Sequence, residues 1–236
     1  MEQLLQQLQE KLQKAYGERL VSLVLYGSAV TGQHHAKFSD YNVLCVLSQL
    51  GPAELADGER IFQWWRGKGS PAPLLLTETE VATSTDCFAI EFHDIKKDHR
   101  ILYGKDVIAG LAVDDSFYRA QVEHDLRAKL LRLRQKAGGM MSDPDLLRRL
   151  LLDSISTFCV LFRHALALHG VEAPAAKRDI IRACAAQFAL NPDPFEKLLD
   201  VREERIKPRE VSANLLLAPY LDGISRVIAA VDGLEK

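Results

Sequence analysis

The apolar patterns typical of β-strands occur only in the first half of this 236-residue chain. Short apolar runs bounded by glycine, proline or polar residues predict strands at 20–25, 41–47, 73–76, 88–93 and 100–103. Helical spacing of apolar residues predicts one helix before the first strand, at 4–16, and one between the strands, at 53–66. A mixed sheet with flanking helices is therefore expected, which places this half in the α+β (mixed α/β) class.

After residue 115 the strand patterns disappear. Helical spacing, with glycine or proline at the ends, predicts helices at 117–136, 142–169, 175–190, 194–205 and 210–231. The second half is thus expected to form an all-α helical bundle. We place the domain boundary between residues 115 and 116, which gives domains 1–115 and 116–236.

Charge and composition exclude several classes of protein. The formal net charge is −2, with −5 in residues 1–115 and +3 in the remainder, so no overall basic field favours nucleic acid as a partner. The four cysteines lack the paired spacing of a zinc site. Neither a signal peptide nor a membrane span is expected, which predicts a cytoplasmic protein without a membrane partner. A homodimer is an open alternative to a monomer.

The most informative segment joins the first two predicted strands. Gly27 and Ser28 follow an apolar strand and precede a short helix, where backbone amides and a small hydroxyl can face a phosphate. Asp40 opens the next strand, and Asn42, two residues later, points to the same face as Asp40. An acidic residue beside a phosphate-binding turn suits magnesium-dependent phosphoryl or nucleotidyl transfer.

This pattern resembles the polymerase-β-like nucleotidyltransferase superfamily, which includes the aminoglycoside nucleotidyltransferases. The Tyr-Gly-Ser-Ala stretch at 26–29, the strand that follows Ser39, and the segment at 100–106 carry the resemblance, which covers residues 18–110. It implies transfer of a nucleoside monophosphate from ATP or another NTP, with Mg²⁺, to an acceptor of small-molecule or macromolecular kind. It also implies a nucleotidyltransferase-type fold followed by a helical bundle.

The resemblance further implies roles for single residues. Nucleotide binding would involve Gly27, Ser28, Ser39 and Asn42, and the metal ligands would be Asp40 and a third carboxylate, for which Glu91 is the natural candidate. Glu123, on the first helix of the second half, is the type of group that would serve as the catalytic base. If the strand at 88–93 continued, Asp94 would point away from Glu91.

One position departs from the family pattern. Asn42 stands where the second carboxylate is expected, and an amide offers a cation one carbonyl oxygen but no negative charge. An alternative function is therefore a non-catalytic protein that binds a nucleotide or a partner. A less favoured alternative is a ribonuclease of the HEPN type, for which Arg163 and His169 have the expected spacing.

Overall fold

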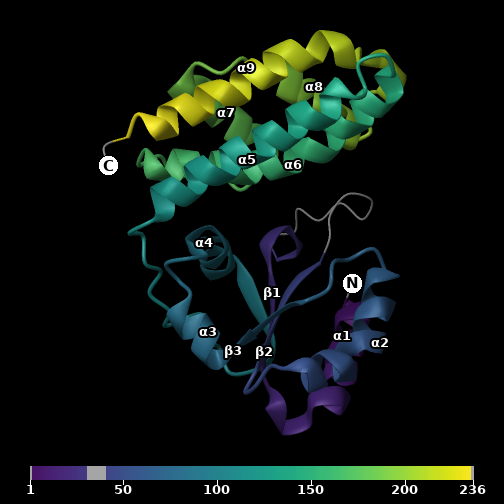
Figure 1. Cartoon of the computed structure of the whole chain (residues 1–236), viewed down its shortest axis with the longest axis vertical. Helices are drawn as coiled ribbons and strands as arrows, with labels where there is room; N and C mark the ends of the chain where they lie inside the picture. Colours follow the sequence, from purple (N-terminus) through teal and green to yellow (C-terminus); the bar gives the residue numbers. More distant parts are fainter. Residues whose placement is uncertain (1, 31–40, 235–236) are drawn as a thin grey trace. The chain divides into compact units, whose positions relative to one another are not determined.

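A computed structural model describes residues 2–30 and 41–234 of the chain. The chain divides into two compact units, Met1–Phe117 and Tyr118–Lys236 (Figure 1). The division falls two residues after the boundary that the sequence predicts. Each unit is described by itself below.

The first unit is built on a four-stranded sheet in the order β3-β2-β1-β4. Its strands are β1 (Leu20–Tyr26), β2 (Asn42–Leu47), β3 (Leu74–Thr77) and β4 (His99–Gly104). The central strand β1 runs antiparallel to both β2 and β4, whereas β3 lies parallel to β2. The predicted mixed sheet is confirmed.

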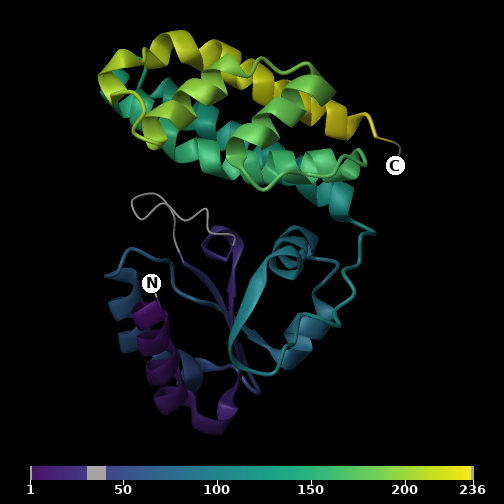
Figure 2. The ribbon, with the colours of Figure 1, turned by 180° about the vertical axis from the view of Figure 1, so that it is seen from behind.

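Helices cover both faces of this sheet (Figures 1 and 2). α1 (Glu2–Tyr16) and α2 (Pro52–Arg66) lie on one face, and α3 (Glu78–Thr83) and α4 (Ala89–Lys97) lie on the other. Alternation along the strands divides the core accordingly. Leu23 and Leu25 pack in the α1 and α2 cluster, whereas Val24 packs with the α4 residues Phe92 and Ile95.

The strand predicted at 88–93 is wrong, because these residues begin α4. The helix starts where the amide of Phe88 donates to the carbonyl of Ser84 and the amide of Phe92 donates to the carbonyl of Phe88. Its buried side chains are Ala89, Ile90, Phe92 and Ile95, which recur at helical spacing. The apolar run that looked like a strand is the buried face of a nine-residue helix.

The second unit is a bundle of α-helices. These are α5 (Tyr118–Gly138), α6 (Pro144–Leu168), α7 (Lys177–Phe188), α8 (Asp193–Arg202) and α9 (Ala213–Asp232). The central helix α6 packs against each of the other four, so its apolar side chains form the core. The predicted bundle is confirmed. The residue that caps α6 is Asp143, whose side chain accepts from the amides of Asp145 and Leu146.

Two helices of the bundle, α6 and α9, are long and apolar enough to cross a bilayer by length and composition. In the folded unit, 50% of the most apolar stretch of α6 and 44% of that of α9 are buried. Both helices serve as core helices of this unit, which explains their apolar character.

Candidate functional site

Three strand ends meet at one edge of the sheet in the first unit. Tyr26, the last residue of β1, pairs with Asn42 at the start of β2 and with His99 at the start of β4. The amide of Gly27 donates to the carbonyl of Asp98 at 3.1 Å, which fixes the chain as it leaves β1. Gly27 and Asn42, which the sequence selects as nucleotide-binding residues, therefore lie side by side.

The turn after β1 needs glycine for its backbone conformation. Gly27 has φ +77°, a left-handed conformation that other residues adopt at a cost, and it begins the short 3₁₀ helix η2 (Gly27–Ala29). A Cβ at this position would lie 3.4 Å from Nδ2 of Asn42. The Gly27 amide donates to Asp98, and the amides of Ser28 and Ala29 belong to the first turn of η2, where backbone N–H groups have no acceptor within the helix.

Glu91 lies on α4, on the same side of the sheet as Asn42 and Tyr26. Its side chain is exposed, whereas that of the adjacent Phe92 is buried, so Glu91 is a surface carboxylate of a helix and not part of the predicted strand. Asp94 follows Glu91 by three residues and shares its side of the helix, which corrects the prediction that the two point apart. Burial raises the pKa of the Tyr26 hydroxyl, and the negative charges of Glu91 and Asp94 raise that pKa further.

A cavity of about 450 Å³ lies beside this edge. Its walls are Tyr26, Asn42, Val43 and the proline-containing segment 71–75, which leads into β3. Tyr26 and segment 71–75 are not among the site residues predicted from the sequence. Tyr26 directly precedes Gly27 and lies on the same face of β1 as the buried Val24, and this sequence pattern could have identified it. Segment 71–75 reaches the site only because β3 pairs with β2, which single-sequence patterns do not reveal.

The described side chains at this edge of the sheet fit a divalent cation only in part. The described residues include no cluster of three or more His, Cys, Asp or Glu side chains that could hold a metal ion. Glu91 and Asp94 supply carboxylate oxygens, which Mg²⁺ prefers, but Asn42 supplies no charge. Ser39 and Asp40 lie outside the described residues, so the pairing of Asp40 with Glu91 as metal ligands stays a prediction.

Comparison with known proteins identifies a fold. No family model and no curated protein matches the sequence. Among solved structures, a spectinomycin adenyltransferase, AAD(9) from Enterococcus faecialis, determined with ATP and spectinomycin, matches with a TM-score of 0.60 at 16% identity. The match covers 97% of this chain and 98% of that protein. This chain shares the fold of that adenyltransferase. The predicted fold, a nucleotidyltransferase-type mixed sheet followed by a helical bundle, is thereby confirmed.

Within this fold, the proposed base Glu123 lies on α5 between two arginines. Arg127 Nε donates to Glu123 Oε1 at 2.8 Å, and Arg119 Nη1 donates to Oε2 at 2.9 Å. These hydrogen bonds, that from Arg127 first, lower the pKa of the Glu123 carboxyl. A carboxylate held in this way is a weaker proton acceptor. The role of Glu123 as the base stays a prediction.

Arg163 and His169 do not form an exposed pair on one side of α6. His169 caps the C-terminal end of the helix, and its ring packs edge-on against Phe188 with the ring centroids 4.9 Å apart. Its Nε2 is buried without a hydrogen-bond partner in the described part of the chain. Six residues along a helix place two side chains about 120° apart around the axis and about 9 Å apart along it, so this geometry gives the ribonuclease alternative no support.

Proposed function

We propose that this chain is a nucleotidyltransferase that transfers a nucleoside monophosphate from ATP or another NTP to a hydroxyl of a small-molecule acceptor. The observation that carries the proposal is the match over the whole chain to a structure determined with ATP and spectinomycin. The convergence of Gly27, Asn42 and Glu91 at one edge of the sheet adds residues of the expected chemistry.

The residues at this edge of the sheet have separate roles in binding the phosphates and the metal. The amides of Ser28 and Ala29 bind phosphate oxygens at the turn, and the amide of Asn42 donates to the same polyphosphate. Mg²⁺, which neutralises phosphate charge when it is bound, would be held by Glu91 and by Asp40. Ser39 is proposed as a further nucleotide contact. Catalysis then rests on positioning the phosphate and stabilising its charge.

The acceptor needs a base that takes the proton from its hydroxyl. Glu123 is the candidate that the family resemblance suggests, and its two arginines weaken it as a base. Glu91, which is exposed on α4, is the alternative base if Asp40 holds the metal without it. A homodimer and a cytoplasmic location stay predictions.

Release of pyrophosphate tests the proposal. ATP, Mg²⁺ and a panel of aminocyclitol and aminoglycoside acceptors should give acceptor-dependent pyrophosphate release. Glu91→Gln should slow it about a hundredfold or more, because one carboxylate serves the metal or the acceptor proton. The matched control is Glu59→Gln, the same change on α2 over the opposite face, which should leave the rate unchanged. A Glu91→Gln protein as active as the Glu59→Gln protein would remove Glu91 from the site.

Asn42 favours the second candidate function, a protein that binds a nucleotide without turnover. In that case ATP binds to the wild-type chain, but no acceptor gives pyrophosphate release. Asn42→Asp would then be expected to restore release, because it supplies the carboxylate of the family pattern. Release by the wild-type chain at a rate that Asn42→Asp lowers would instead favour the enzyme.

A further inference from the structure

The helical unit contains a groove between α5 and α9, two helices that pack against each other (Figure 1). Residues within 127–134 of α5 and within 225–232 of α9 line this α5–α9 groove. Its volume is about 380 Å³, which lies in the range of sites that bind small molecules. The described lining residues all belong to the second unit, so a site here is independent of the proposed function.

The α5–α9 groove has an apolar base and an exposed apolar wall. Leu130 and Ile228, which are each only 5% exposed, form the base. Leu131 lines the groove although its side chain is 59% exposed, and Ala229 is also exposed. A ligand with an apolar part would cover these side chains and would remove apolar surface of both molecules from water.

The two arginines of the groove differ in their partners. Arg127, at one end, donates from Nε to Glu123 Oε1 at 2.8 Å and pairs through Nη2 with Asp232 Oδ2 at 3.1 Å, so its charge is compensated. Arg134 lies about 10 Å further along α5. It makes no hydrogen bond or ion pair with any residue that the structure describes. Its planar guanidinium therefore has donors available for an anionic group.

The charge around Arg134 also favours an anion. Residues 129–136 of α5 include four basic side chains and no acidic one, and none of the four pairs with a carboxylate in the described parts of the chain. One available guanidinium matches one carboxylate, which it can bind through two parallel hydrogen bonds. We propose that the α5–α9 groove binds a small monocarboxylate with an apolar body. Its carboxylate lies at Arg134, and its apolar body lies on Leu130 and Ile228.

Titration of the full, isotope-labelled chain with octanoate, followed by NMR, tests the proposal. Octanoate should shift the amide signals of α5 and α9 with a Kd of about 1 mM or lower. Acetate, which has the charge without the apolar body, and octan-1-ol, which has the apolar body without the charge, should each bind about tenfold or more weakly.

Two variants and a matched control place the ligand in the groove. Arg134→Gln should weaken octanoate binding about tenfold or more, because it removes the charged donors. Arg132→Gln, the same change at an exposed position of α5 that does not line the groove, should bind as the wild type does. Ala229→Phe, at an exposed position of α9, should fill the groove and abolish binding.

Several results would overturn the proposal. Equal octanoate affinity of Arg134→Gln and Arg132→Gln would do so, as would octan-1-ol binding as tight as that of octanoate, because the charge would then not matter. Octanoate that shifts only signals outside α5 and α9 binds elsewhere. If octanoate does not bind and the wild-type chain is a dimer that Ala229→Phe dissociates, a second copy covers the groove and the proposal is wrong. None of these results bears on nucleotide binding at the Gly27 turn.

Discussion

Glu54 links α1 and α2, the helices on one face of the sheet, through hydrogen bonds. Its carboxylate accepts from Gln49 at 2.9 Å, from Arg19 at 2.7 Å and from the amide of Gly51 at 2.9 Å. Tyr16, at the end of α1, donates its hydroxyl to the Glu54 carbonyl. These hydrogen bonds, led by those from Gln49 and Arg19, lower the pKa of Glu54 from 4.5 to about 2.

The lowered pKa of Glu54 determines how the stability of the folded state changes with pH. The ionised group stabilises the folded state fully above pH 4.5, and this contribution is lost as the pH falls towards 2. Glu54→Gln should therefore lower the melting temperature at pH 7, and the difference from wild type should shrink below pH 4.5. Thermal melts across this range measure it. Glu59→Gln, on the exposed side of α2, is the control, and a difference that stays constant with pH would contradict the assignment.

The sequence identifies single residues of the site better than it identifies their neighbours. Gly27 and Asn42 stand out because a glycine turn between two apolar strands is a local pattern. The influence of Glu91 and Asp94 on Tyr26 depends on how α4 packs over the sheet, which no local pattern contains. Gly27 and Asn42 were therefore predictable, but the placement of Glu91 and Asp94 near Tyr26 was not.

Among the elements, α4 shows why a short apolar run is ambiguous. The sequence from Phe88 to His93 alternates bulky and small or polar residues, which is typical of a strand. Extended by two residues, the same segment shows Ala89, Phe92 and Ile95 at spacings of three, which suits a helix that packs by one face. Packing on Val24, Leu44 and Val46 of the sheet decides between the two. At the start of α3, by contrast, the capping box of Thr77 and Glu80 is a purely local signal that the sequence itself contains.

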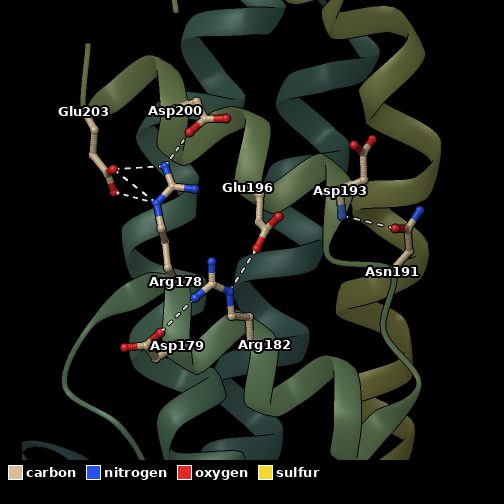
Figure 3. A network of polar contacts seen from close by, with 8 residues as sticks. All are labelled: Arg178, Asp179, Arg182, Asn191, Asp193, Glu196, Asp200 and Glu203. Atoms are coloured by element: carbon tan, nitrogen blue, oxygen red, sulfur yellow. Dashed lines mark hydrogen bonds and ion pairs between the residues drawn. The ribbon is translucent and has the colours of Figure 1, made fainter. Parts of the chain in front are cut away.

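In the helical unit, a polar network joins α7 to α8 (Figure 3). Arg178 donates to Asp200 at 2.6 Å and to both carboxylate oxygens of Glu203, at 2.9 to 3.3 Å. Only 15% of the Arg178 side chain is exposed, so loss of the guanidinium would remove a partner from two partly buried carboxylates, of which Glu203 keeps its ion pair with Arg205. Arg182, one turn later, is 63% exposed and makes ion pairs of 3.4 Å.

These two arginines give a matched pair of substitutions on one helix. Arg178→Met should lower the free energy of unfolding by about 1–3 kcal/mol, because it breaks a partly buried network. Arg182→Met should change it by less than about 0.5 kcal/mol, since exposed ion pairs contribute little. Urea titrations measure both. Equal losses for the two variants would show that the Arg178 network does not stabilise the contact of α7 with α8.

At the scale of the whole molecule, a change in apolar spacing separates two units of different kind. The first carries a mixed sheet and a net charge of −5 in residues 1–115, and the second is a helical bundle with +3. Composition and periodicity are sufficient to predict this division, since every helix of the bundle has its own apolar stripe. The order and direction of the strands were not predictable, because they depend on pairing between segments far apart in the sequence.

The central claim is that a nucleotide binds at the sheet edge formed by Gly27 and Asn42. A crystal structure of the chain with a non-hydrolysable ATP analogue and Mg²⁺ tests it most directly. We expect the polyphosphate within about 3 Å of the Ser28 and Ala29 amides and of Asn42 Nδ2, as hydrogen bonds require. A nucleotide bound with its phosphates away from this turn, or bound only in the helical unit, would contradict the claim.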